Sequence, residues 1–115
     1  MMAIENGMAG LYQDAHLLID FEGRRAALDS RPLALTNKEF ELLAFLASHA
    51  GMIVSPTALL TNVWGYSTEV RTRTLDVHLS RLRKTLGPYG DQYLERVFRM
   101  GCRFQPCREA LRMSA

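Results

Sequence analysis

The stretch from Thr72 to Leu86, TRTLDVHLSRLRKTL, constrains the fold more than any other part of the chain. Its leucines recur at helical spacing and, at 100° per residue, fall within about 60° of one another on a helix. Such a stripe must be buried against a core. The leucines of this stripe are Leu75, Leu79, Leu82 and Leu86.

The opposite side of the same helix is polar and cationic over about 100°. It carries Arg73, Val77, Ser80, Arg81 and Lys84. His78 and Arg83 flank this face. For an arbitrary helix the pattern more often marks a solvated surface than a binding site. The neighbouring segments must therefore decide between the two.

Two further helices are predicted before this one. Thr36 and Glu39 have the spacing of a capping box, apolar residues follow at helical intervals, and Gly51 supplies a stop. Ser55 followed by Pro56 predicts the start of a second helix, which ends at Gly65. Its apolar side includes Trp64, expected in the core. The second and third helices make a helix-turn-helix with the basic helix second, the position of a recognition helix.

Short strands are predicted at both ends of the chain. Residues 17–21, 25–28 and 32–35 are apolar segments separated by turn signals, which favours a small antiparallel meander. Residues 93–97 and 102–104 predict a hairpin that carries Arg96, Arg99 and Arg103. Residues 1–15 are expected to be a loose lead-in, 52–54 an extended link and 108–115 a tail. The fold class is therefore α+β, with a single domain over residues 16–107.

Charge is distributed unevenly along the chain. Residues 71–108 hold nine Arg/Lys and three Asp/Glu, a net charge of +6, whereas residues 1–70 hold four and eight, a net charge of −4. A basic half of this kind suits an anionic partner. No apolar run is long enough for a membrane span, and no secretory signal is visible. We therefore expect a cytoplasmic protein without a membrane association.

Nothing in the sequence predicts catalysis, a metal or a cofactor. Cys102 and Cys107 are expected to be free thiols, and the three histidines lack the spacing of zinc ligands. Asp14, like the other acids, is not placed as one of an acid/base pair. No nucleophile–base pair and no glycine-rich phosphate loop is present. An enzyme is therefore not expected.

Together these segments resemble a known family. The helix opened by TNKEF, the helix ending VWGY, the run RTRTLDVHLSRLRKTLG and the hairpin ending GCRF are similar to the OmpR/PhoB-type winged-helix output domain of bacterial two-component response regulators. The similarity covers roughly residues 17–106. It implies a winged helix-turn-helix that binds double-stranded DNA in transcription regulation. It also implies a phosphorelay regulator, in which a receiver domain usually precedes the output domain.

The resemblance assigns roles to particular positions. The third helix would lie in the major groove and the hairpin, the wing, on adjacent backbone or minor groove. Residues 65–71, with Tyr66, Ser67, Thr68, Glu69 and Val70, match the loop that meets RNA polymerase. The family also implies tandem binding of two copies to direct half-sites. Helix positions that match DNA contacts are Arg73, Val77, His78, Ser80, Arg81 and Arg83.

The residues themselves leave the division of these roles open. Arginine can pair with guanine or with phosphate, so the sequence does not say whether Arg73 or Arg81 reads a base. Lys84 and Arg83 are expected on phosphates, or alternatively solvated in the last helical turn. His78 is expected on a phosphate, with an interfacial histidine as the alternative.

The chain departs from the family at the start of the second helix and in the wing. Pro56-Thr57 replaces Arg-Glu, so one phosphate contact is lost, and Ser80 stands where some members have arginine. The wing, usually VRGxGYxF, here reads VFRMGCRF, so contacts by Arg99 and Arg96 are hypotheses only. These changes motivate one alternative: a protein-interaction module that kept the fold but lost DNA reading.

Overall fold

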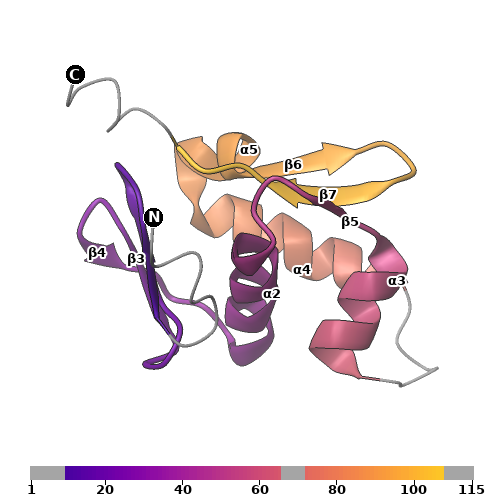
Figure 1. The fold of residues 1–115 in the computed structure, drawn as a ribbon, viewed down its shortest axis with the longest axis horizontal. Helices are drawn as coiled ribbons and strands as arrows, with labels where there is room; N and C mark the ends of the chain where they lie inside the picture. Colours follow the sequence, from indigo (N-terminus) through magenta and orange to yellow (C-terminus); the bar gives the residue numbers. More distant parts are fainter. Residues whose placement is uncertain (1–9, 66–71, 108–115) are drawn as a thin grey trace.

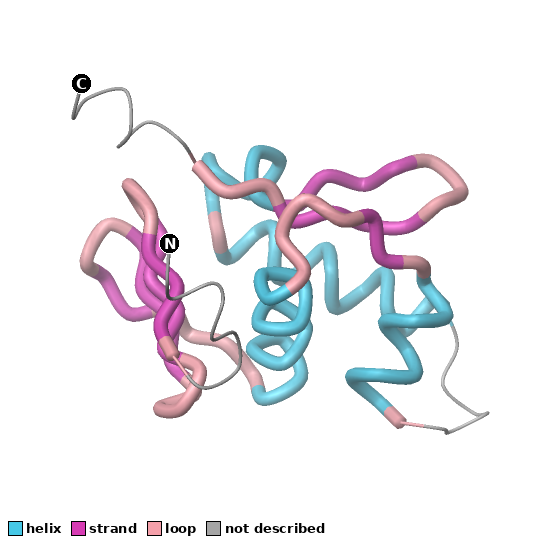
Figure 2. The backbone as a smooth tube through the Cα atoms, viewed as in Figure 1, coloured by secondary structure: helices cyan, strands magenta, loops and turns pink. Residues whose placement is uncertain are grey.

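The computed structural model describes residues 10–65 and 72–107. Figure 1 shows an N-terminal sheet at one end, helices in the middle, and a C-terminal sheet along the top that ends in a protruding hairpin. Figure 2 shows the same separation of strands and helices along the backbone. The main helices are α2 (Asn37–Ser48), α3 (Pro56–Leu59) with its π-helical continuation (Leu60–Trp64), and α4 (Thr72–Thr85).

The N-terminal sheet is antiparallel, and its four strands are neighbours in chain order. The predicted strands over 17–21 and 25–28 are confirmed to within one residue. The third strand of the predicted meander is also present, but it is shorter than the predicted 32–35 and starts earlier, because Asp29 and Ser30 adopt positive φ angles of 50° and 68° and make a tight turn. The return strand therefore starts at once, with Arg31 opposite Leu28. The strands are β1 (Leu11–Gln13), β2 (Leu17–Asp20), β3 (Arg25–Leu28) and β4 (Arg31–Pro32).

Strand β1 corrects the prediction of a lead-in over residues 1–15. Tyr12 pairs with Ile19 across the sheet, and its ring meets Phe104 edge-on at a centroid distance of 5.4 Å. This partner lies at the other end of the chain, so local sequence gave no signal for it. The N-terminal boundary of the predicted domain therefore moves from residue 16 to at least residue 10, the first residue described.

The predicted capping box opens α2. The Thr36 hydroxyl accepts a hydrogen bond from the Glu39 backbone N–H at 3.2 Å, and the Glu39 carboxylate accepts one from the Thr36 N–H at 3.2 Å. Both bonds satisfy donors that a helix start would otherwise leave unpaired. The side chains of α2 that face inward make the middle of the core. They are Phe40, Leu42, Leu43, Ala44, Leu46 and Ala47.

The second helix starts where predicted but changes its winding. The Ser55 hydroxyl accepts from the Ala58 N–H at 3.1 Å, and Pro56 occupies the first turn. After Leu59 the helix continues as a π-helix and stops at Gly65, where φ is +85°. The expected end at Gly65 is confirmed, and the π-helical half was not foreseen.

Helix α4 lies with its leucine stripe against this core. All four predicted leucines are buried. The 3₁₀ turn Gly87–Tyr89 and the one-turn helix α5 (Gly90–Tyr93) follow. A Cβ on Gly90 would lie 2.4 Å from the Arg83 carbonyl oxygen, so glycine is what allows α5 to pack this closely on α4. The sequence missed α5 and started the next strand one residue early.

The C-terminal hairpin is confirmed as β6 (Leu94–Val97) and β7 (Gly101–Phe104). The segment predicted as an extended link over 52–54 is instead a third strand, β5 (Ile53–Val54), paired with β7. Gly101 allows the start of β7 to approach the end of β5 closely. Its φ is +136°, and a Cβ there would lie 1.9 Å from the Val54 carbonyl oxygen. The hairpin is thereby fixed to the chain that enters α3. Among the described residues the main helices number three, as predicted, with α5 added.

Candidate nucleic-acid interface

The exposed face of α4 carries the residues that the sequence placed there. Val77 is 40% exposed although it is apolar. Arg73, Ser80, Arg81 and Lys84 are exposed around it. A shallow depression of about 530 Å³ runs along this face, lined by Arg73, Asp76, Val77, Ser80 and Arg81. The structure therefore confirms the two-sided helix, while contact with DNA at each position stays a prediction.

Three cations of this face have no carboxylate partner among the described residues. Within the described part of the chain, no carboxylate oxygen lies within 4.0 Å of the charged groups of Arg73, Arg81 or Lys84. Unpaired surface cations on one helix raise the local positive potential. This face can therefore accept an anion without first breaking an ion pair.

Arg83 is in a different situation. Its guanidinium is partly buried and is hydrogen-bonded to the Asp91 carboxylate at the start of α5. The predicted phosphate contact by Arg83 would have to share this guanidinium with Asp91. Ser80, Arg81 and Lys84 line a second depression of about 410 Å³ beside the pair.

His78 points away from the centre of the basic face. Its Nδ1 lies 2.8 Å from the Thr74 carbonyl oxygen, and because a carbonyl only accepts, Nδ1 carries the hydrogen. Its ring meets Trp64 edge-on at 5.1 Å. This geometry is that of an interfacial histidine, the alternative that the sequence left open, with Nε2 as its remaining polar atom. Trp64 is half-buried rather than fully in the core.

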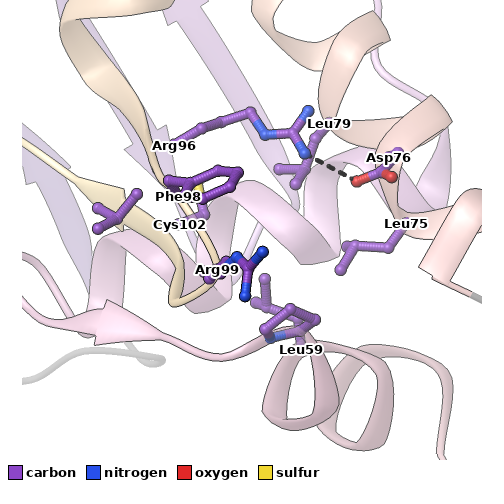
Figure 3. Close-up of a pocket in the computed structure, with 11 residues that line it drawn as sticks. Leu59, Leu75, Asp76, Leu79, Arg96, Phe98, Arg99 and Cys102 are labelled. Atoms are coloured by element: carbon purple, nitrogen blue, oxygen red, sulfur yellow. Dashed lines mark hydrogen bonds and ion pairs between the residues drawn. The ribbon is translucent and has the colours of Figure 1, made fainter.

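The wing is tied to α4 by an ion pair that the sequence did not reveal. The Arg96 guanidinium donates to the Asp76 carboxylate at 3.0 Å (Figure 3). Arg96 and Asp76 are 20 residues apart on different elements, so no spacing rule predicts their contact. Arg96, predicted as a DNA contact, is thus partly committed to positioning the hairpin.

A groove of about 480 Å³ separates the wing from α3 and α4 (Figure 3). Its floor is apolar, with Leu59, Leu79 and Cys102, and its rim holds Arg96 and Arg99. The Cys102 thiol is buried, which raises its pKa. Both cysteines are free, as predicted, and both are buried. Both rim arginines belong to the hairpin and Asp76 is on the α4 side, so the cations of this groove lie on its wing side.

At the tip of the wing the Arg99 guanidinium lies over the Phe98 ring, 5.1 Å from its centroid. The Arg99 backbone has φ of +65°, a conformation that arginine adopts only at a cost. Arg103, also predicted on the hairpin, is bonded to Glu95 at 2.7 Å on the neighbouring strand. Arg99 is therefore exposed at the tip, whereas the Arg103 guanidinium is already paired with Glu95.

The predicted polymerase loop, Tyr66, Ser67, Thr68, Glu69 and Val70, lies outside the described residues. The described residues contain no group of three or more His, Cys, Asp or Glu side chains able to hold a metal ion. None of the described helices is both long and apolar enough to cross a membrane.

Comparison with known proteins places this geometry in a family. Residues 30–104 match the model for "Transcriptional regulatory protein, C terminal". The chain belongs to the OmpR/PhoB-type family of transcriptional regulator DNA-binding domains. The resemblance noted in the sequence is therefore confirmed, and so is the winged-helix fold class.

Two curated relatives illustrate the match. The chain is 39% identical over 89 residues to the phosphate regulon transcriptional regulatory protein PhoB of Escherichia coli, covering 76% of this chain and 39% of that protein. It is 36% identical over 86 residues to the response regulator ArlR of Staphylococcus saprophyticus, covering 74% of this chain and 39% of that one. The chain thus spans about two fifths of the length of these relatives.

Solved structures agree with this assignment. The Klebsiella pneumoniae RstA DNA-binding domain in complex with the RstA box superposes with a TM-score of 0.73 at 34% identity, covering 84% of this chain and 98% of that one. DrrB, a Thermotoga maritima OmpR/PhoB homologue, gives a TM-score of 0.75 at 32% identity, covering 83% of this chain and 44% of that one.

Proposed function

We propose that this chain binds double-stranded DNA in a sequence-specific manner, with α4 in the major groove and the β6–β7 hairpin on adjacent backbone or minor groove. The observation that carries the proposal is the exposed face of α4, which holds Arg73, Arg81 and Lys84 without a carboxylate partner among the described residues. A major groove admits a helix of this kind, and its base edges and phosphates need such donors.

The contacts divide by chemistry. Arg81 and Arg73 have planar forks suited to guanine O6 and N7, or to a phosphate, and Val77 can pack on a thymine methyl. Lys84 is a point charge and fits a phosphate. Arg83, His78 and Arg96 contribute at the edges, each already holding an intramolecular partner.

Regulation and partners follow from the family rather than from the geometry. Because the curated relatives are more than twice as long as the matched part, we propose that this domain is the output end of a phosphorelay response regulator. RNA polymerase contact through residues 66–70 and pairing of two copies on direct half-sites belong to the same proposal. A monomer has one recognition helix, so two copies would double the length of sequence read.

Selection of bound sequences from a random duplex pool tests the proposal directly. A DNA-reading domain enriches a defined motif, and the spacing of repeated half-sites reports tandem binding. Affinity for the enriched duplex should fall steeply with salt, because several phosphates are neutralised. Failure to enrich any motif, with no mobility shift at low salt, would leave the protein-interaction module as the better account.

A further inference from the structure

The tip of the β6–β7 hairpin exposes two large apolar side chains. Phe98 is 83% exposed and Met100 is 55% exposed, at a turn that protrudes from the body of the molecule (Figure 1). Elsewhere in the described chain Phe21, Phe40 and Phe104 are buried and Phe45 is partly buried. Large apolar groups held in water on a protruding turn are typical of a binding surface.

The tip is held in place from two directions. At its base, Gly101 passes so close to the Val54 carbonyl that no other residue fits. On its flank, Arg96 is bonded to Asp76 of α4. The orientation of the tip relative to the basic face of α4 is therefore set before any partner binds. A pre-oriented contact loses less conformational entropy on binding.

The chemistry of the tip combines an apolar body with positive charge. The Arg99 guanidinium stacks over the Phe98 ring, and Arg96 lies on the same side of the hairpin groove. A partner that fits must offer apolar surface bordered by negative charge. The stacked bases of a DNA minor groove, bordered by phosphates, have this composition.

We propose that Phe98 and Met100 form an apolar wedge that enters the minor groove next to α4 and partly unstacks one base step. The inference rests on the proposed function, because α4 must first dock on the duplex. The groove between wing and helix is lined by Leu75 and Asp76 of α4 and by Phe98 of the tip, so helix and wedge are parts of one continuous surface (Figure 3).

A protein partner fits the tip less well. Two side chains on a narrow turn offer far less than the roughly 800 Å² per partner that a stable protein interface buries. Insertion into a base stack needs only one or two side chains, because most of the binding energy comes from contacts elsewhere on the duplex. The Arg99 guanidinium beside the wedge also favours an anionic partner.

The test uses the full chain and the duplex enriched by selection, with 2-aminopurine placed at successive positions flanking the motif. Wild-type binding should raise 2-aminopurine fluorescence at one step, because unstacking relieves quenching. Phe98→Ala should abolish this rise and weaken binding roughly tenfold, the effect of losing one buried aromatic ring. The slope of log K against log salt should not change, since no charge is removed.

Two variants make the result specific. Phe98→Leu keeps an apolar wedge and should retain most of the fluorescence rise. Met52→Ala removes an apolar side chain that is 59% exposed, close to the 55% of Met100. Met52 lies beyond the end of β5 that is farthest from the tip. It should leave both affinity and fluorescence as in the wild type.

Four outcomes would overturn the wedge. Wild-type binding without a fluorescence rise at any position would reject unstacking while leaving DNA binding intact. An unchanged affinity and rise for Phe98→Ala would reject the role of the ring. Sedimentation could instead show that Phe98→Ala no longer binds the duplex as two copies, while the wild type shows no fluorescence change. That result would mean that the tip contacts a second copy of the chain. Absence of any duplex binding by the wild type would reject the wedge together with the proposed function.

Discussion

Arg81 and Arg83 lie two residues apart on α4, yet their side chains have different surroundings. Arg81 is exposed and has no carboxylate within 4.0 Å among the described residues, whereas Arg83 is partly buried against Asp91. Helical periodicity separated the centre of the basic face from its flanks correctly. It could not show that Arg83 is paired, because Asp91 belongs to α5, a helix that local sequence did not predict. The two arginines are therefore expected to contribute differently to DNA binding.

Arg81→Ala should weaken binding to the selected duplex by about 1–3 kcal/mol if the guanidinium pairs with a base. Binding to a scrambled duplex of the same length should fall less. Titration of both duplexes by fluorescence anisotropy measures the two losses. Arg25→Ala, on an exposed arginine of the N-terminal sheet, is the matched control and should change neither. Equal losses on both duplexes would make Arg81 a phosphate contact.

Asp91→Asn should tighten DNA binding at low salt by up to a few-fold. The substitution removes a carboxylate that competes with phosphate for Arg83 and keeps the shape of the side chain. The gain is small because partly exposed ion pairs contribute about 0–1 kcal/mol. Affinity measured between 50 and 200 mM salt, conditions in which counterion release dominates, checks it. No difference from wild type across that range would show that Arg83 does not approach a phosphate.

At the scale of elements, local signals located the starts of helices well. The capping box of α2 and the Ser55-Pro56 start of α3 involve residues three positions apart, which sequence displays directly. Strand β5, helix α5 and the π-helical turn were not predicted, because local sequence does not display the contacts between distant segments. Strand β5 exists because β7 pairs with it from 50 residues away, and α5 because Gly90 fits against α4. Such elements depend on tertiary contacts that override local preference.

Thr36→Ala should lower the free energy of unfolding by about 0.5–2 kcal/mol, because it removes the hydroxyl that accepts from the first turn of α2. Urea denaturation followed by circular dichroism gives this quantity. Thr36→Ser keeps the hydroxyl and should remain within a few tenths of a kcal/mol of wild type. DNA affinity of the folded Thr36→Ala protein should be unchanged, because α2 packs in the core, away from the exposed face of α4. A Thr36→Ala protein as stable as Thr36→Ser would contradict the role of the cap.

At the scale of the whole molecule, the Asp14 carboxylate links segments from both ends of the described chain. Asp14, just after β1, accepts hydrogen bonds from the hydroxyls of Tyr12 at 2.5 Å and Tyr93 at 2.6 Å. It also accepts one from the Cys107 N–H at 3.0 Å. No local pattern distinguishes Asp14 from the other acids, because Tyr93 and Cys107 lie 79 and 93 residues away. Its contacts connect the N-terminal sheet to α5 and to the end of the described chain.

The electrostatics of this site follow from the same contacts. Burial raises the pKa of the Asp14 carboxyl, but hydrogen bonds from Tyr12, Tyr93 and two backbone N–H groups lower it by more. The pKa of this carboxyl is therefore below its usual value of 3.8. Burial, with the hydrogen bond to Asp14, raises the pKa of the Tyr93 phenol. A carboxyl with a depressed pKa stabilises the fold above its unfolded pKa, and this stabilisation is lost as pH falls through the folded value.

Asp14→Asn should therefore destabilise the protein by about 1–3 kcal/mol at neutral pH, because it leaves hydroxyl donors poorly satisfied. The difference from wild type should shrink as pH falls below the usual carboxyl pKa of 3.8. Denaturant unfolding at a series of pH values measures it. Asp91→Asn, on an exposed carboxylate, serves as the control and should show little change in stability. A pH-independent difference would mean that the charge of Asp14 is not what stabilises the sheet.

On the whole molecule, we expect the DNA interface to combine the exposed face of α4 with the protruding β6–β7 hairpin (Figure 1). The most direct measurement is a titration of ¹⁵N-labelled protein with the selected duplex, followed by amide chemical shifts. We expect the largest changes over residues 73–84 and 96–100, with strands β1–β4 nearly unchanged. Changes concentrated in the N-terminal sheet, with α4 unperturbed, would contradict it.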